Sequence, residues 1–376
     1  MSGKSRRRRT SVAIAVTVLG GVGITLVTSG CSGPGRAAAE ANPAVTHFQG
    51  SSSAVPVSTA TASMSESGLI GFAAGELLSS DPGSQLQQLK QMKSMGMTTV
   101  RVDANWAGGE PTQGSFDWTT LDSIMSSVHQ VGMTADLIID GCPPWAAAQG
   151  ATGQFAQPAS PAQFAAWAAA VAARYGPKGA GYFEIWNEPN LSNFWSPSPN
   201  PAAYTADLQA AYVAIKAADP ASVVISAGLA AIDSNSGNID PVTFLGAMYN
   251  DGAKGHFDAV GDHPYTFPAD PNNDSQGKWG EMDQTSPSLR SLMIAHGDAA
   301  KKIWITEFGA PTGNVTDAQQ ATELTQAITA AKHTSWIAAF YIYTWSDQDG
   351  GDGFGLLDSN GKPKPAYTAV TAALTS

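Results

Sequence analysis

The chain has 376 residues, of which 43% are hydrophobic and only 14% are charged. A chain of this composition can bury a large core, which excludes a disordered or fibrous protein. Lys and Arg number 20 against 31 Asp and Glu, giving a formal net charge of −11. Such an acidic chain repels phosphate backbones, so nucleic acid is excluded as a partner and a neutral ligand is favoured.

The first 30 residues are predicted to be an export signal. Basic residues between Lys4 and Arg9 precede an apolar run from about Val12 to Val27, which is the order of charge and hydrophobicity found in secretory signals. The run is about 16 residues long and contains three glycines, which is short for a permanent transmembrane helix. We therefore expect an exported protein, with an uncleaved N-terminal anchor as the alternative.

The surroundings of Cys31 resemble a bacterial lipoprotein signal, in which a cysteine preceded by small residues becomes acylated. Small residues directly precede Cys31, although Thr28 stands where a leucine is usual. We expect lipidation of Cys31 and anchoring at the cell surface, with cleavage after Ala39 and plain secretion as the alternative. The other cysteine, Cys142, is interpreted as a small buried side chain near a strand end.

Residues 31–67 are predicted to be a flexible linker, and residues 68–376 a single folded domain. Between Ser32 and Glu66, 24 of 35 residues are Ser, Thr, Ala, Gly or Pro, which is typical of a tether. From Gly68 onward, apolar β-branched runs alternate with Ala-rich helical stretches. This alternation predicts parallel strands covered by helices.

Eight strand and helix units follow one another, which predicts an α/β protein with a (β/α)8 TIM barrel. No Gly-rich nucleotide-binding motif follows any of the strands. Helical patterns include 85–95, 161–175, 201–218 and 318–332. The predicted strands are 69–74, 98–104, 134–140, 182–187, 222–227, 257–263, 302–307 and 337–344.

Polar and aromatic residues gather at the ends of these strands, where a barrel of this type carries its chemistry. Glu188 directly follows the fourth predicted strand, and Glu307 ends the seventh. The fourth and seventh strands stand nearly opposite each other in an eight-stranded barrel. Two carboxyl groups facing one another are what the cleavage of a glycosidic bond requires, since one protonates the leaving oxygen while the other attacks or activates water.

The segments around both glutamates resemble a known group of enzymes. Residues Tyr182–Asn190 and Ile303–Gly309 are similar to the acid/base and nucleophile signatures of glycoside hydrolase clan A, whose members are retaining (β/α)8 enzymes. Trp106–Trp118, Pro143–Trp145 and Phe354–Tyr367 are most similar to glycoside hydrolase family 39, with family 5 next.

The resemblance implies a role for each residue of the site. Glu188 is expected to be the general acid/base and to stay protonated near neutral pH. Glu307 is expected to be the nucleophile, which forms a covalent glycosyl intermediate and retains the anomeric configuration. Asn187 is expected to bind the sugar 2-hydroxyl, and Arg101 and Tyr265 to hold Glu307 ionised and aimed.

Further side chains are expected to surround the sugar. The resemblance implies that His263 lines the same subsite and that Trp345 forms a floor on which the sugar stacks. Trp145 is a second candidate platform, for which packing is the alternative interpretation. Glu184, inside the fourth predicted strand, is interpreted as a supporting polar core residue.

The function predicted from the sequence is a retaining O-glycosidase that cleaves β-linkages of an extracellular or cell-envelope oligosaccharide or polysaccharide. No cofactor and no metal are expected, because the six histidines include no H-x-H or H-E-x-x-H pair. The alternative is a catalytically inactive carbohydrate-binding or scaffold barrel. The sugar, its linkage, exo or endo action and the oligomeric state are left open.

Overall fold

The computed structural model describes residues 68–235, 237–275, 277–349 and 352–375. The predicted export signal, Cys31 and the whole of the predicted linker lie outside these residues. Among the residues described, no helix combines the length and the apolar composition that crossing a membrane requires.

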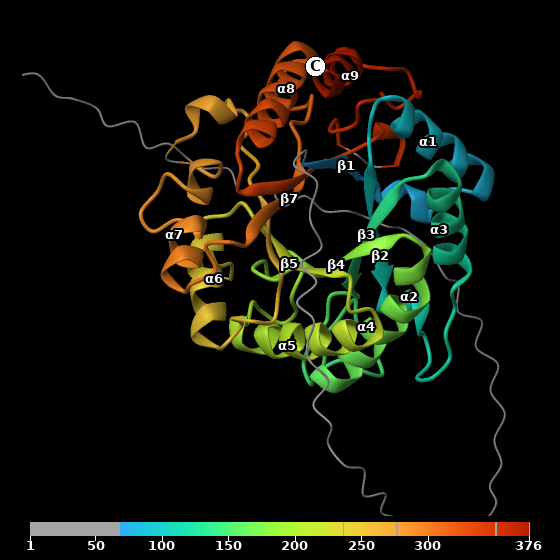
Figure 1. Cartoon of the computed structure of the whole chain (residues 1–376), viewed down its shortest axis with the longest axis vertical. Helices are drawn as coiled ribbons and strands as arrows, with labels where there is room; N and C mark the ends of the chain where they lie inside the picture. Colours follow the sequence, from blue (N-terminus) through green and yellow to red (C-terminus); the bar gives the residue numbers. More distant parts are fainter. Residues whose placement is uncertain (1–67, 236, 276, 350–351, 376) are drawn as a thin grey trace, which may run out of the picture. The chain divides into compact units, whose positions relative to one another are not determined.

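The eight parallel strands close into a barrel in chain order, which confirms the predicted (β/α)8 fold (Figure 1). Closure comes from the pairing of the first and last strands, in which Leu69 lies opposite Ala339 and Phe72 opposite Ile342. The strands are β1 (Leu69–Ala73), β2 (Thr99–Asn105), β3 (Thr134–Asp140), β4 (Ala180–Asn187), β5 (Val223–Ala230), β6 (Ala259–His263), β7 (Lys302–Phe308) and β8 (Ile337–Ile342).

Two strands end two or more residues away from the predicted position. β5 continues past Ala227 to Ala230, because Leu229 and Ala230 pair with β6; the glycine at position 228 weakens the strand signal in the sequence. β8 ends at Ile342 instead of Thr344. The hydroxyl of Thr344 donates to the backbone oxygen of the last β1 residue, 2.9 Å away, and the chain turns there.

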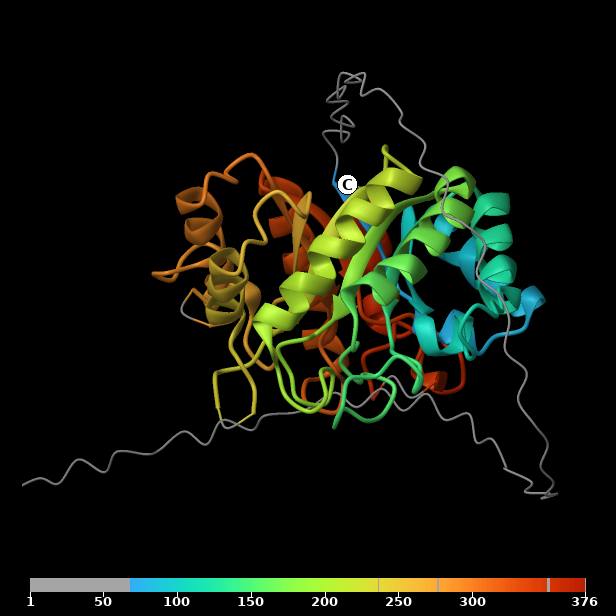
Figure 2. The same ribbon diagram turned by 90° about the horizontal axis from the view of Figure 1, so that it is seen from below.

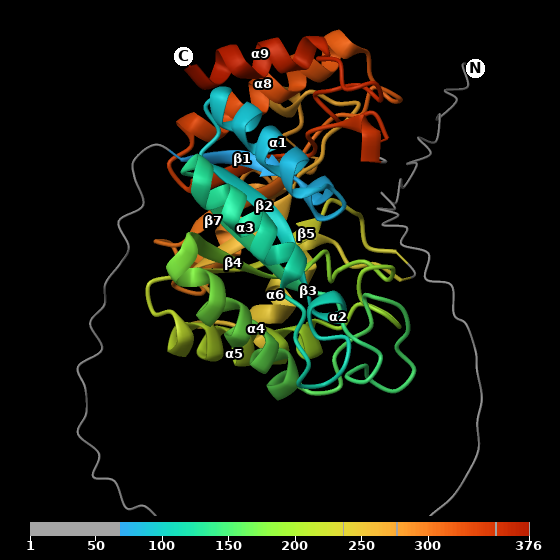
Figure 3. The same cartoon turned by 90° about the vertical axis from the view of Figure 1, so that its right-hand side faces the viewer.

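Most helices begin where a capping side chain stands, since the first amides of a helix need an acceptor. Asp81 and Asp240 accept from such amides, and Ser288 and Thr316 form capping boxes. Figure 3 shows α9 lying beside α8. The helices are α1 (Pro82–Ser94), α2 (Trp106–Gly109), α3 (Thr119–Val131), α4 (Pro161–Tyr175), α5 (Pro201–Ala218), α6 (Pro241–Asn250), α7 (Leu289–Ala295), α8 (Asp317–His333) and α9 (Pro365–Thr375).

Two separate apolar clusters hold the barrel together. The larger lies between the strands and the surrounding helices, and the smaller fills the barrel interior. In the interior, the rings of Trp304 and Tyr341 stack with centroids 6.3 Å apart. Both residues lie two positions before interior residues of the rim, Thr306 and Tyr343, so they close the barrel beneath the site.

The long connections that follow β3, β5 and β8 gather at one end of the barrel, at the lower edge of Figure 2. This is the end at which the strands terminate. Parallel strands therefore bring the residues that follow them to a common rim, as the sequence pattern predicts.

Candidate active site

The two glutamates meet at this rim. One carboxyl oxygen of Glu188 and one of Glu307 lie within 4.8 Å of each other. The side chains are 12% and 13% exposed, so both are largely buried but still reachable. The backbone turns sharply at the end of β4, where Trp186 and Glu188 have φ angles of 71° and 47°. Such left-handed conformations are strained for these residues and are common where a side chain is aimed at a functional site.

Glu307 is surrounded by donors. Nη1 of Arg101 donates to its Oε1 at 2.7 Å, and the hydroxyl of Tyr265 donates to its Oε2 at 2.8 Å. Burial opposes ionisation of this carboxyl, but the positive charges of His263 and Arg101 and the two hydrogen bonds outweigh it and lower the pKa of Glu307. The site therefore holds Glu307 as a carboxylate.

Glu188 has a different environment, with one close polar partner. Nδ1 of His263 lies 2.9 Å from its Oε1. Burial raises the pKa of Glu188 above its usual value, although the hydrogen bond with His263 acts in the opposite direction. Burial also disfavours a charged imidazole, but Glu307 and Glu188 outweigh it and raise the pKa of His263. The pKa values of Glu188 and His263 are therefore shifted upward, whereas that of Glu307 is shifted downward.

Arg101 joins several acceptors inside the barrel, where it is 3% exposed. It donates twice to Glu184, at 2.6 and 3.2 Å, and once to Oδ1 of Asn187, at 2.8 Å. Glu184 also accepts from the amide of Gly228, at 2.7 Å. Glu184, interpreted from the sequence only as a polar core residue, is thus the second carboxylate that shares the guanidinium with Glu307.

Thr306 is a member of this network that sequence reasoning missed. Its hydroxyl lies 3.0 Å from Nε2 of His263 and 3.1 Å from Oε1 of Glu184. The sequence signal that could have found it is the alternation of side chains along β7, which turns Thr306 to the barrel interior. Hydrogen bonds therefore link the surroundings of both catalytic candidates.

Trp345 does not reach the two carboxyl groups. It belongs to the cluster between strands and helices, is 2% exposed, and packs against Phe72 and Tyr367 with ring centroids 5.3 and 6.0 Å away. A ring covered on this side of the strands offers no face to a sugar. The expected floor beneath the sugar is therefore not formed by Trp345, because β8 ends two residues earlier than predicted.

Tyr343 occupies the interior position at the end of β8 instead. Its ring packs edge to face with Phe354 and Tyr265, at centroid distances of 5.2 and 6.5 Å. Burial and the charge of Glu307 raise the pKa of its hydroxyl. This half-buried ring is the aromatic side chain that β8 places beside the carboxyl groups.

Trp145 lies in the connection after β3. Its indole nitrogen donates to the backbone oxygen of Glu110 at 3.1 Å, and its ring packs edge to face with Trp106 at 5.4 Å. It is half-buried. These contacts fix its orientation at the rim and leave its predicted role as a platform open.

Three further acidic side chains surround Arg101 and were not anticipated from the sequence. Burial raises the pKa of Asp136 and Asp140 well above the usual value, and that of Asp103 to a smaller extent. Both oxygens of Asp136 lack a hydrogen-bond partner among the residues described. Burial thus disfavours a charge on these three carboxyl groups, and the hydrogen bonds of Arg101 to carboxyl groups go to Glu184 and Glu307.

Glu188, His263 and Glu307 are also close enough together to hold a metal ion. However, Arg101 and Tyr265 already donate to both oxygens of Glu307, and a guanidinium at hydrogen-bond distance disfavours a second cation. The donor set suits proton transfer better than metal binding. The absence of a metal stays a prediction.

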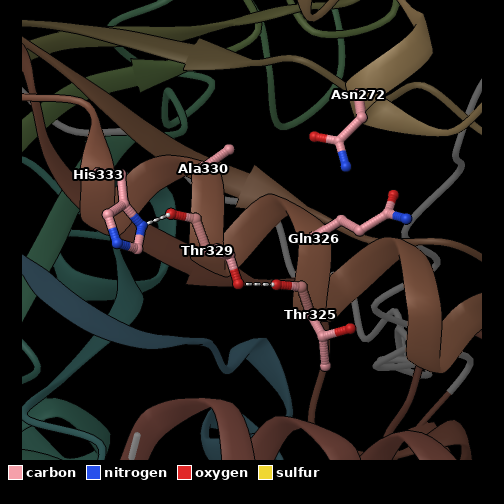
Figure 4. A pocket seen from close by; sticks show the side chains of 6 residues that line it. All are labelled: Asn272, Thr325, Gln326, Thr329, Ala330 and His333. Atoms are coloured by element: carbon pink, nitrogen blue, oxygen red, sulfur yellow. Dashed lines mark hydrogen bonds between the residues drawn. The ribbon is translucent and has the colours of Figure 1, made fainter.

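A separate pocket of about 360 Å³ lies against α8. Its polar groups bond within the helix, as Figure 4 shows. His333 contacts the backbone oxygen of Thr329, and the hydroxyl of Thr329 donates to the backbone oxygen of Thr325. None of its lining residues belongs to the carboxylate site. The lining residues are Asn272, Thr325, Gln326, Thr329, Ala330 and His333.

Residues 60–347 match the family described as cellulase, glycosyl hydrolase family 5. No curated protein sequence matches the chain.

Solved structures with the same architecture belong to related families. A family 39 glycoside hydrolase from the gut symbiont Bacteroides cellulosilyticus WH2 is 20% identical, with a TM-score of 0.64 over 82% of this chain and 64% of its own. The GH39 enzyme from Xanthomonas axonopodis pv. citri is 19% identical, with a TM-score of 0.62 and coverages of 81% and 65%. A GH5_18 protein from Bifidobacterium longum subsp. infantis is 17% identical, with a TM-score of 0.60 and coverages of 82% and 79%.

The chain thus spans 64% and 65% of the length of the first two structures, slightly less than two thirds. At these identities the likeness shows the barrel fold.

Proposed function

Because the chain belongs to the cellulase family, glycosyl hydrolase family 5, we propose that it is a retaining O-glycosidase acting on β-linked sugars of an oligosaccharide or polysaccharide. The observation that carries this proposal is the short distance between two carboxyl groups whose surroundings shift their pKa values in opposite directions. One carboxyl oxygen of Glu188 lies within 4.8 Å of one carboxyl oxygen of Glu307. This distance suits the separation of about 5–5.5 Å in retaining enzymes, whereas inverting enzymes need about 6.5–9.5 Å to admit a water.

In the first step, Oε of Glu307 attacks the anomeric carbon while Glu188 gives its proton to the glycosidic oxygen. The carbon to oxygen bond of the substrate breaks, the leaving sugar departs as an alcohol, and a glycosyl ester on Glu307 remains. Arg101 and Tyr265 orient the carboxylate and keep it ionised. In the second step, Glu188 takes a proton from water, whose oxygen displaces Glu307 from the sugar.

Two other side chains complete the proposed sugar subsite. Asn187 is held by Arg101 through its Oδ1, which leaves its amide nitrogen to donate to the sugar 2-hydroxyl. Tyr343, in place of Trp345, presents an aromatic ring to the C–H face of the sugar. Both residues stand on the ends of strands, so the subsite is built on rigid elements.

The proposal is tested by incubating the full chain with a panel of β-glycans and aryl β-glycosides. The panel includes β-xylosides and β-mannosides, since similar structures include a monomeric beta-xylosidase from Caulobacter crescentus CB15 and an exo-beta-1,4-mannosidase from an Opitutaceae bacterium. We expect cleavage that Glu188→Gln and Glu307→Gln both abolish on natural linkages. NMR of the first product is expected to show the β-anomer. Glycan binding without cleavage would instead support the inactive binding barrel, and an α-anomer would contradict retention.

The proposed location is the cell surface, with the domain tethered through a lipid on Cys31 and the Ser/Thr/Ala-rich segment that follows it. The apolar run and the small residues before Cys31 support this proposal. We expect the expressed chain to fractionate with membranes and to incorporate labelled fatty acid. Cys31→Ser is expected to remove the label, and persistence of the label in this variant would contradict lipidation at Cys31.

A further inference from the structure

Behind the two catalytic carboxyl groups, hydrogen bonds join Glu184 to Glu188 through Thr306 and His263. The Thr306 hydroxyl lies 3.1 Å from Oε1 of Glu184 and 3.0 Å from Nε2 of His263. Nδ1 of His263 in turn lies 2.9 Å from Oε1 of Glu188. Glu184, Thr306 and His263 are all 0% exposed, so bulk water does not replace these contacts.

The first link of this chain has only one possible direction. Glu184 accepts two hydrogen bonds from Arg101 and one from the amide of Gly228, as an ionised carboxylate does. A carboxylate has no proton to give, so the Thr306 hydroxyl must donate to Glu184. A hydroxyl has a single proton, and the oxygen of Thr306 is therefore left to accept from His263.

We propose that Glu184 and Thr306 lock His263 in the form protonated at Nε2, so that Nδ1 faces Glu188 and the catalytic proton is held between these two side chains. The proposal rests on the proposed glycosidase function for its catalytic meaning. Glu184 and Thr306 are positioning residues, since they act on the reaction through His263.

The tautomer of His263 that Glu184 and Thr306 fix, called the lock below, decides whether Glu188 carries a proton to give. A neutral imidazole protonated at Nδ1 would donate to Glu188 and stabilise its carboxylate, which would lower the pKa of Glu188 and leave less of it with a proton to give at the working pH. With Nε2 protonated, the lone pair of Nδ1 accepts the proton of Glu188 instead. When that proton moves to the glycosidic oxygen, the new carboxylate faces the lone pair, which favours recovery of a proton from water in the second step.

Other charged and titratable groups near His263 influence where the proton lies within the pair formed by His263 and Glu188. Oε2 of Glu307 lies 3.8 Å from Nδ1 and attracts the proton toward the imidazole, whereas the charge of Arg101 acts against this. Whether the proton resides on Nδ1 or on Oε1, the pair holds one. The groups that face or adjoin the ring are Glu188, Glu307, Arg101, Tyr265 and Asp262.

Gly228 provides the space for this contact. A Cβ atom there would lie 2.0 Å from Nε2 of His263 and 2.4 Å from the hydroxyl oxygen of Thr306. Any side chain at this position would therefore push His263 and Thr306 apart. The amide of the same residue donates to Glu184, so the glycine supports both ends of the link.

The decisive variant is Thr306→Val, which keeps the shape of the side chain and removes the hydroxyl. Thr306→Ser restores the hydroxyl, and Thr99→Val is a matched control because Thr99 is another fully buried interior threonine, bonded to Tyr341. Rates are compared between a substrate whose leaving group is a sugar and one whose leaving group is dinitrophenol, which departs without a proton.

For Thr306→Val we expect kcat/KM on the sugar leaving group to fall by about tenfold or more, since general acid catalysis contributes about 10²–10⁴-fold. For the dinitrophenyl substrate we expect kcat/KM to fall less than about twofold, because its leaving group needs no general acid. The alkaline limb of the pH profile is expected to move to lower pH, and Thr306→Ser to behave as the wild type. Equal losses on both substrates with an unmoved pH profile would overturn the proposal and indicate a merely structural role.

The tautomer can be observed without any substrate by ¹⁵N NMR of the imidazole of His263. Its signals are assigned as those that disappear in His263→Gln. We expect a protonated Nε2 in the wild type and a protonated Nδ1 in neutral Thr306→Val. A neutral wild-type imidazole protonated at Nδ1 would overturn the lock, whatever the activity. If the tautomer is as expected but no glycan is cleaved, the proposed function fails and the lock stands.

Discussion

Glu188 and Glu307 are the same type of residue, at the same rim and with nearly equal side-chain exposure, 12% and 13%. Their pKa values nevertheless move in opposite directions, upward for Glu188 and downward for Glu307. The difference lies in their partners, because Glu307 receives hydrogen bonds from Arg101 and Tyr265 whereas Glu188 meets the imidazole of His263. Burial alone therefore does not assign the roles of acid and nucleophile; the placement of donors does.

This asymmetry also predicts the shape of the pH profile of kcat/KM. Glu307 must be ionised, so activity falls at acid pH as its lowered pKa is crossed. Glu188 must be protonated, so activity falls at alkaline pH as its raised pKa is crossed. The variants below separate the two limbs.

The largest effect is expected for Glu307→Gln, which removes the proposed nucleophile. We expect kcat to fall by about 10⁴-fold or more with every leaving group, since no other described group stands in its place. The measurement is turnover of both a natural linkage and a dinitrophenyl glycoside. Substantial turnover of either substrate, at an unchanged melting temperature, would show that Glu307 is not the nucleophile.

Glu188→Gln is expected to have a smaller effect that depends on the leaving group. Turnover of natural linkages should fall by about 10²–10⁴-fold, because general acid catalysis is lost, and formation of the glycosyl ester from dinitrophenyl substrates should change little. The alkaline limb should disappear from the profile of that step. Equal losses for both substrates would contradict the assignment of Glu188 as the acid.

Arg101→Met removes the cation that helps to lower the pKa of Glu307 relative to that of Glu188. Without it the pKa of Glu307 rises, so the acid limb of kcat/KM should move to higher pH. Stability at neutral pH should fall by about 3–5 kcal/mol, because the buried carboxylates lose their partner. Urea denaturation and a pH profile measure both effects. Arg101→Lys keeps the charge but not the forked geometry, and is expected to shift the limb less.

The linkage to stability has a definite sign for Glu307. Its pKa is lower in the folded than in the unfolded state, so it contributes stability above its unfolded pKa, and this is lost as the pH falls through the folded value. The decrease in the free energy of unfolding on acidification should therefore be smaller in Glu307→Gln than in the wild type. An identical pH dependence of unfolding would argue against a lowered pKa.

The smallest effect on turnover is expected for the aromatic side chains near the end of β8. Tyr343→Ala should raise KM by about tenfold through loss of a stacking contact. Trp345→Ala should leave KM nearly unchanged but reduce stability by about 3–5 kcal/mol, because it empties a packed position between strands and helices. Calorimetry and kinetics distinguish the two, and the reverse pattern would restore Trp345 as the sugar platform.

The barrel and the two glutamates could be predicted from local patterns. Alternating apolar runs and helical stretches predicted eight strands, and parallel strands bring Glu188 and Glu307 to one rim. The roles of Tyr343 and Trp345 could not be read in this way. Side chains two positions apart lie on the same face of a strand, so alternation alone does not distinguish Tyr343 from Trp345. The choice depends on where β8 ends, and Thr344 contacts β1 at that point.

The sequence by itself determined the fold class, the strand order and the two catalytic candidates, because these follow from periodicity and from short motifs within one strand end. Only the tertiary structure decided in which direction the pKa of each carboxyl group is shifted and which residues cause the shift. Arg101, Glu184, Thr306 and His263 come from four different strands, and their hydrogen bonds exist only once the barrel is closed. Protonation follows from such contacts and from burial, and neither is a property of a residue's neighbours in the chain.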